Sequence, residues 1–296
     1  MPSASHRPRR SVLYVPASNE RALAKIASLA CDAVILDLED AVAPAEKAAA
    51  REKLSAFMKQ RPAGGPEIVI RINPIASEWG ADDLLLAVRL EADGILLPKI
   101  DTPRDILEAG DVLDDNFAAD AIRLWAMIET PKAILNLGAM AELGRDPASR
   151  LAGFVAGSND LARETGIKVA PDRRYLIPLL VHMVVAARAG GLVALDGVVN
   201  AFRDAERFAL ECEEAASMGF DGKTLIHPDQ IGPANKAFAP GAEAIAEARA
   251  IVSAFARAEN AGKGAIAIDG RMVERLHLTQ AEALLAKAAM IEGRKT

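Results

Sequence analysis

The sequence lacks the cysteine and histidine spacing of disulfide-rich and zinc-binding proteins, and it lacks the basic excess of nucleic-acid-binding proteins. Its two cysteines, Cys31 and Cys212, lack metal-type spacing, so neither a disulfide framework nor a thiolate site is supported. The four histidines show no paired spacing either, which disfavours zinc. Acidic residues outnumber basic ones, 41 to 35, and this balance argues against a nucleic-acid partner.

Long apolar runs are also missing. The most apolar stretch, residues 175–195, contains Pro178, Arg188 and the pair Gly190–Gly191, which predicts a buried helix followed by a strand instead of a membrane span. The basic residues 1–9 lack the apolar segment of a secretory signal, and we expect them to form a flexible tail. We therefore expect a cytoplasmic protein with no membrane partner.

Alternation of short apolar runs with longer helical patterns is the main structural signal. Aromatic residues make up only 4% of the chain, as in proteins whose Ala-rich helices pack on a Val, Ile and Leu sheet. The near-continuous apolar runs are typical of parallel strands that are covered on both faces. Eight strands are predicted: residues 11–16, 33–39, 67–73, 94–100, 123–129, 151–158, 192–198 and 222–228.

Eight strand-then-helix units predict an α/β fold, a (β/α)8 TIM barrel over residues 10–240. A doubly wound open sheet is the alternative, but the segment VPASNE after the first strand lacks a Gly-rich phosphate turn. Residues 241–296 predict a small helical lid: one helix, a break at Gly262–Gly264, a short strand AIAID and a last helix from about Thr279. We expect this segment to pack on the barrel mouth or on a neighbouring subunit.

Charged and polar residues recur where the predicted strands end, at Asp37, Glu39, Asp40, Arg71, Asn73, Lys99, Glu129, Asp160, Asp196 and His227. A single charged residue at a strand end can simply cap a helix or contact solvent. Charged or polar residues at seven strand ends instead favour one common functional site. In a (β/α)8 barrel these ends form the mouth where active sites are built. Several carboxylates placed together repel one another unless a cation or protons relieve them, and a hard divalent ion such as Mg²⁺ is the simplest solution.

Four basic residues near the predicted strand ends and on a predicted helix require interpretation. Lys99 could form a Schiff base with a keto substrate, although that chemistry does not need the nearby carboxylates. His227 is interpreted as a residue that anchors a loop. Lys47 and Arg51 are four residues apart on a predicted helix, and we expect a solvated or ion-paired face there.

A set of motifs resembles a known family. The segments, in chain order, are RSVLYVPASN, DAVILDLEDAVAPAEKAAAR, VIRIN, LLPKI, MIETPKAILN, AGSNDLARETG, DGKTLIHPDQI and GKGAIAIDGRMVE. Each is weak evidence alone, but their order and spacing together resemble the citrate lyase β-subunit-like branch of the HpcH/HpaI aldolase superfamily. The similarity covers nearly the whole chain.

The resemblance implies roles for particular residues. Glu129 and Asp160 would bind Mg²⁺, Arg71 would hold the substrate's carboxylate or carbonyl oxygen beside Glu129, and Glu39 and Asp40 would lie behind the metal-bound water and Arg71. The implied enzyme is a carbon–carbon lyase that cleaves a citryl-, malyl- or citramalyl-CoA type thioester by a retro-Claisen reaction. Its partners would be an acyl-CoA or acyl-carrier-protein thioester and a 2-keto acid.

Two alternatives to the lyase remain open, and the resemblance also implies an oligomeric state. Malate synthase or thioesterase activity on the same intermediates is one alternative to the lyase. A carrier-dependent subunit that is inactive alone is another. Family members form trimers or multiples of trimers, so a homotrimer or hexamer is implied.

Glu274 yields the first testable prediction. It stands where the resemblance implies a catalytic aspartate that reaches a neighbouring subunit's site. The added methylene moves the carboxylate by roughly an ångström, and such a displacement can cost about 100-fold in rate. Glu274 is then either a catalyst retuned for a different acyl group or a surface residue that has lost the role. Glu274→Asp and Glu274→Ala are assayed for cleavage, synthesis and thioester hydrolysis, and with a retuned catalyst we expect Glu274→Ala to slow at least one of them. Unchanged rates for all three reactions in Glu274→Ala would exclude a catalytic role.

Overall fold

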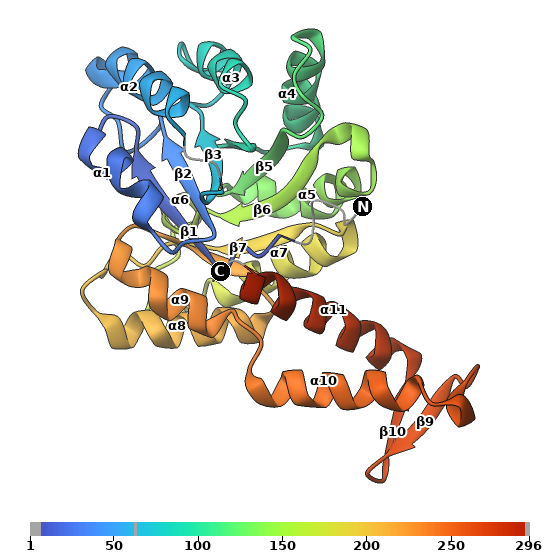
Figure 1. Ribbon diagram of the computed structural model, residues 1–296. Helices are drawn as coiled ribbons and strands as arrows, with labels where there is room; N and C mark the ends of the chain where they lie inside the picture. Colours follow the sequence, from blue (N-terminus) through green and yellow to red (C-terminus); the bar gives the residue numbers. More distant parts are fainter. Residues whose placement is uncertain (1–6, 62–63, 294–296) are drawn as a thin grey trace. The chain divides into compact units, whose positions relative to one another are not determined.

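The computed structural model describes residues 7–61 and 64–293, and its main unit is a closed parallel barrel (Figure 1). The strands follow the chain order around the ring, and β1 pairs with β8 to close it. This arrangement confirms the predicted (β/α)8 fold. The barrel strands are β1 (Ser11–Pro16), β2 (Ala33–Asp37), β3 (Glu67–Arg71), β4 (Gly94–Leu97), β5 (Arg123–Ile128), β6 (Leu151–Ala156), β7 (Val193–Asp196) and β8 (Gly222–Leu225).

Helices connect the strands and surround the barrel. Thr102 and Thr130 precede helices that begin with proline, a sequence pattern typical of helix starts. The apolar segment 175–195 folds into a helix and then a strand, as predicted. The α-helices of this unit are α1 (Glu20–Lys25), α2 (Lys47–Lys59), α3 (Gly80–Arg89), α4 (Pro103–Asp115), α5 (Pro131–Glu142), α6 (Ser158–Thr165), α7 (Ile177–Gly190), α8 (Ala205–Met218) and α9 (Ile231–Ala237).

In the part of the chain that the structure describes, no helix has the length and apolar character needed to span a bilayer.

Several strands end two or three residues earlier than the sequence predicts. For example, β2 stops at Asp37 and not at Glu39. The reason is local, because the backbone N–H of Glu39 donates to the carboxylate of Asp37 at 2.9 Å and not to a neighbouring strand. The charged residues after the strands therefore lie in loops at the mouth.

Alternate residues of the strands point into the barrel and fill it with apolar side chains, as the two-residue period of a strand requires. This inner core consists of Val12, Ala33, Ile35, Val69, Leu96, Trp125, Met127, Val155, Val193 and Leu195. At the end where the strands begin, Arg9 forms a buried ion pair with Glu67 at 2.7 Å and lies over the ring of Trp125. Arg9, which the sequence assigns to the tail, is thus buried, while residues 1–6 lie outside the described residues.

Asp196 corrects one sequence prediction. Ala194 belongs to the core between strands and helices and Leu195 to the inner core, so Asp196 faces the helices and not the mouth. There its carboxylate lies 2.5 Å from Lys223 and 2.9 Å from Arg173, and all three side chains are buried. Asp196 therefore links β7, β8 and the loop before α7.

Residues from Ala239 onward form a second compact unit. It contains α10 (Ala242–Phe255), the antiparallel hairpin of β9 (Ala265–Ile268) and β10 (Arg271–Glu274), and α11 (Arg275–Gly293). Phe255 and Ile266 are buried in its small core. The sequence predicts only the first of these strands, and the last helix begins four residues before the predicted Thr279.

The Asp196 cluster leads to a stability prediction. We expect Asp196→Asn to lower the free energy of unfolding by about 3–5 kcal/mol, because it leaves Lys223 buried without its closest anion. Burial alone would raise the pKa of Asp196, but Lys223 and Arg173 lower it below its usual value. The stabilisation is therefore present above the pKa of the unfolded chain and is lost as pH falls through the folded-state pKa. Urea unfolding at neutral and acidic pH measures both effects.

Asp172→Asn is the matched control, because that carboxylate is exposed and pairs with Arg174 on the surface. Its stability should stay close to that of the wild type at neutral pH. Equal stability of wild type and Asp196→Asn at neutral pH would contradict the prediction.

Candidate active site

Arg71 lies at the centre of a charged cluster at the barrel mouth. Its Nε and Nη2 atoms donate to the two carboxylate oxygens of Asp37 at 2.7 and 2.6 Å. Its Nη1 atom lies 2.8 Å from Glu39 Oε2 and 3.4 Å from Asp40 Oδ2. The structure thus brings together Arg71, Glu39 and Asp40 as the resemblance implies, and it adds Asp37 as the residue that fixes the guanidinium.

Glu39 is the titratable group of this cluster. Burial raises the pKa of its carboxyl to about 8, with Arg71 opposing and the charges of Asp40, Glu129 and Asp37 contributing to the rise. Burial acts to lower the pKa of Arg71, but Asp37 raises it well above its ordinary value, so the guanidinium stays charged. Glu39 can therefore exchange a proton near neutral pH beside a permanent cation.

A second pair of carboxylates lies at the same mouth, from Glu129 after β5 and Asp160 in the first turn of α6. Both contact Lys99. The backbone N–H of Lys99 donates to Glu129 Oε1 at 2.7 Å, and its Nζ atom lies 2.5 Å from Asp160 Oδ1 and 3.5 Å from Glu129 Oε2. Lys99 has a φ of 52°, a left-handed conformation that is uncommon for a side-chain-bearing residue and recurs at functional sites.

Gly157, which lies just before α6, is required by the position of Glu129. A Cβ atom built at Gly157 would lie 2.4 Å from the Cβ of Glu129 and 2.7 Å from its Oε2. Contacts this short are not tolerated, so any other residue would displace Glu129. The glycine of the AGSNDL segment therefore makes room for the carboxylate that follows β5.

Glu129 and Asp160 fit a magnesium ion. Oε2 of Glu129 is buried and has no hydrogen-bond partner among the described residues. Lys99 and Arg163 both contact Oδ1 of Asp160, at 2.5 and 2.6 Å, which leaves Oδ2 available. Within the described residues no group of three or more His, Cys, Asp or Glu side chains could hold a metal. Two carboxylates completed by water and substrate oxygens suit Mg²⁺ in particular.

The contacts of Lys99 weigh against a Schiff base. Burial acts to lower its pKa, but the hydrogen bond to Asp160 and the charges of Glu129 and Asp160 raise it above its usual value. A Schiff base requires the neutral amine as nucleophile. Lys99 is instead held as an ammonium ion between the two carboxylates.

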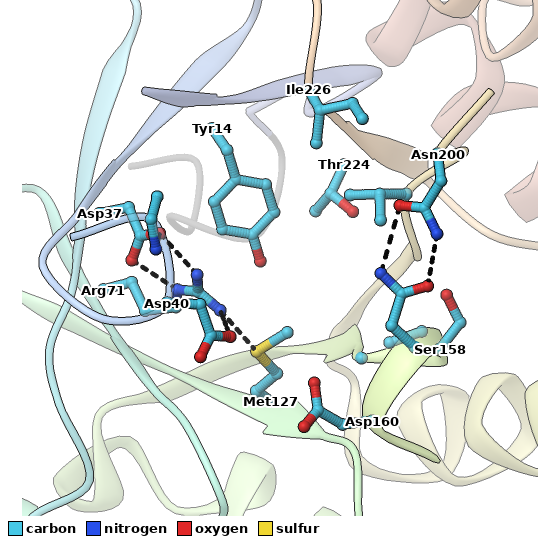
Figure 2. A pocket seen from close by; sticks show the side chains of 15 residues that line it. Tyr14, Asp37, Asp40, Arg71, Met127, Ser158, Asp160, Asn200, Thr224 and Ile226 are labelled. Carbon is cyan, nitrogen blue, oxygen red and sulfur yellow. Dashed lines mark hydrogen bonds and ion pairs between the residues drawn. The ribbon is translucent and has the colours of Figure 1, made fainter. Parts of the chain in front are cut away.

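A cavity of about 290 Å³ opens between the two groups of charges (Figure 2). Asn159 and Asn200 line its rim and exchange hydrogen bonds through their amides at 3.3 and 2.8 Å. The lining residues are Tyr14, Asp37, Asp40, Ala41, Arg71, Met127, Ala156, Gly157, Ser158, Asn159, Asp160, Val198, Asn200, Thr224 and Ile226. The cavity therefore presents a guanidinium at one wall and a carboxylate at another.

Lys47 corrects another sequence prediction. It is buried, and its ammonium donates to the backbone carbonyls of Leu38 and Glu39 at 2.8 and 3.0 Å. Its role is thus to fix the loop that carries Glu39, and it does not lie on a solvated face. Arg51 is ion-paired, as expected, with Asp83 at 2.7 Å.

His227 anchors a loop, in agreement with its interpretation from the sequence. Its Nδ1 atom accepts a hydrogen bond from the backbone N–H of Asp229 at 3.3 Å, and its ring stacks on Phe202. Glu274 lies in the second unit at the end of β10, where its backbone N–H donates to His277 at 3.0 Å. Its catalytic role stays a prediction.

Tyr14 is a cavity residue that the sequence reasoning missed. A usable signal was present, because Tyr14 is two residues after Val12 and shares its inward face in β1. Its ring lies over the guanidinium of Arg71, 4.9 Å from the ring centroid.

Comparisons with known proteins agree with this geometry. The HpcH/HpaI aldolase/citrate lyase family profile matches residues 10–228. A (3S)-malyl-CoA thioesterase of Cereibacter sphaeroides is 44% identical over 96% of both chains. The human mitochondrial citramalyl-CoA lyase is 32% identical over 98% of this chain and 89% of its own.

Solved structures lead to the same family. CitE of Mycobacterium tuberculosis, in complex with magnesium, acetoacetate and coenzyme A, superposes with a TM-score of 0.75 at 29% identity. The match covers 96% of this chain and 99% of that one. With the family profile and the relatives in agreement, the chain belongs to the HpcH/HpaI aldolase/citrate lyase family, as its motifs predict.

Proposed function

We propose that the protein is a Mg²⁺-dependent carbon–carbon lyase that cleaves a short β-hydroxyacyl thioester into a 2-keto acid and a smaller acyl thioester. The observation that carries the proposal is the arrangement of one fixed guanidinium, Arg71, and one carboxylate pair, Glu129 and Asp160, at the mouth of the same barrel. The magnesium in the CitE structure and the citramalyl-CoA lyase among the relatives support it. The thioester is proposed to be an acyl-CoA or an acyl carrier protein derivative.

Metal binding, substrate binding and proton exchange are proposed for different residues of the site. Glu129 and Asp160 would hold the ion, which when bound supplies Lewis-acid charge to the oxygens of the substrate. Arg71 donates to a carboxylate or carbonyl oxygen of the keto-acid portion and stabilises the charge that develops there. Glu39 is buried beside this guanidinium and can hold or release a proton near neutral pH.

Cleavage then proceeds as a retro-Claisen reaction. The substrate hydroxyl loses its proton and becomes the carbonyl of the 2-keto acid. The adjacent carbon–carbon bond breaks, and its electron pair moves to the carbon beside the thioester as an enolate. Protonation of that carbon releases the smaller acyl thioester.

Thioester hydrolysis is a second candidate, favoured by the 44% identity to a (3S)-malyl-CoA thioesterase. In that reaction water attacks the thioester carbonyl and the carbon–sulfur bond breaks. The products are a hydroxy acid and a free thiol. The two reactions can use the same carboxylates and guanidinium to bind the substrate.

Product analysis tests the proposed function. Purified protein with Mg²⁺ is incubated with malyl-CoA and with citramalyl-CoA, and the products are separated by chromatography. A lyase gives glyoxylate and acetyl-CoA from malyl-CoA, whereas a thioesterase gives malate and free CoA. Absence of both product sets from both thioesters would contradict catalysis on free CoA substrates and would favour the carrier-dependent subunit.

Metal binding yields a separate prediction. We expect Glu129→Gln and Asp160→Asn each to weaken Mg²⁺ binding by more than about 100-fold, because even residues behind a metal ligand typically contribute 10- to 100-fold. Each change removes a negative ligand and keeps the side-chain shape. Isothermal titration calorimetry with Mg²⁺ measures the affinity, and circular dichroism checks that the fold is retained.

Glu108→Gln provides the control, because that carboxylate is exposed on α4 and pairs with Arg104 on the surface. Its Mg²⁺ affinity should match the wild type. Wild-type affinity in both Glu129→Gln and Asp160→Asn would place the metal elsewhere.

A further inference from the structure

The hydroxyl group of Tyr14 forms no hydrogen bond with the residues that the structure describes. The oxygen atom of this hydroxyl is buried. Tyr14 also lines the cavity of about 290 Å³ at the barrel mouth. Figure 2 shows the ring directed into this cavity, with its hydroxyl toward the space between Arg71 and Met127. A buried hydroxyl without a partner costs about 1–3 kcal/mol, so its position calls for a ligand that supplies one.

The surroundings of Tyr14 hold its ring in one orientation. The ring lies over the guanidinium of Arg71, 4.9 Å from the ring centroid, and that guanidinium is fixed by two hydrogen bonds to Asp37. A cation over an aromatic face is an attractive arrangement. The orientation of the ring, and with it the direction of the hydroxyl, is therefore set before a ligand enters the cavity.

Tyr14 acts as a donor in this position. Burial raises the pKa of its phenol; the charge of Arg71 opposes the rise, and nearby carboxylates such as Asp37 and Glu129 add to it. The phenol thus keeps its proton. Arg71 carries only donors, so a group that meets both residues must offer acceptor oxygens, and the protonated phenol of Tyr14 can donate to one of them.

We infer that Tyr14 donates a hydrogen bond to an oxygen of the 2-keto acid that Arg71 binds, and so helps to position that acid for bond cleavage. The inference rests on the proposed function for the identity of the ligand. It assigns to β1 a substrate contact beside that of Arg71 at the end of β3. The hydroxyl supplies a hydrogen bond without transferring its proton.

Tyr14→Phe tests this inference, since it removes the hydroxyl alone and keeps the ring over Arg71. Oxalate, a stable analogue of a 2-keto acid, is titrated into the Mg²⁺-loaded protein by calorimetry, and malyl-CoA turnover is measured in parallel. We expect oxalate binding to weaken by about 10- to 100-fold, the range for loss of one hydrogen bond to a charged group. Turnover should fall by a similar factor.

The sequence offers a matched control and a spectroscopic readout. Tyr14 and Tyr175 are the only two tyrosines, and Tyr175 is 60% exposed. Tyr175→Phe should bind oxalate like the wild type, and it leaves Tyr14 as the single tyrosine. Its ultraviolet difference spectrum should then shift when oxalate binds, because the phenol gains an acceptor.

The outcomes separate this inference from the proposed function. Wild-type oxalate affinity in Tyr14→Phe overturns the inference, whatever the turnover. Weaker oxalate binding in Tyr14→Phe supports it even if the wild type cleaves no thioester, in which case the proposed function alone fails. Absence of oxalate binding to the wild-type protein overturns the inference, whereas the products formed from malyl-CoA decide the proposed function.

Discussion

The paired hydrogen bonds between Arg71 and Asp37 fix the geometry on which the rest of the mouth depends. Both side chains are buried, and breaking such a pair typically costs about 3–5 kcal/mol because one charge is left without a partner. With the guanidinium locked on one side, its remaining Nη1 atom is directed at Glu39 and Asp40, and its face supports Tyr14. The guanidinium is therefore oriented before any ligand arrives.

Two buried ion clusters on opposite sides of the barrel wall illustrate different uses of charge. Around Asp196, the cations of Lys223 and Arg173 both contact one carboxylate, and the cluster holds strands and loop together. Around Glu129, the balance is incomplete, since one oxygen stays without a hydrogen-bond partner among the described residues. A carboxylate oxygen without a hydrogen-bond partner near a cavity, and not the burial of charge alone, distinguishes the cluster around Glu129 from the cluster around Asp196.

Lys99 connects the two carboxylates that we propose as magnesium ligands. Its left-handed conformation lets one residue contact Glu129 through its N–H and Asp160 through its ammonium. Gly157 completes this arrangement by leaving space for Glu129. The two carboxylates come from segments about thirty residues apart in sequence and meet only because parallel strands end at one edge.

The sequence by itself determined the fold, the family and most of the charged residues at the mouth, because eight strand–helix units place their strand ends together whatever the details of packing. It could not decide which face a residue takes in a strand that is apolar on both sides, since such a run has no period to read. Asp196 was therefore misplaced, whereas Tyr14 was overlooked although its two-residue spacing from Val12 places both on one face of β1. Only the tertiary structure decided that Lys47 is buried, because its acceptors are carbonyls that the loop after β2 brings to it. Partners and burial depend on segments far apart in the chain, whereas strand order and motif spacing are local properties.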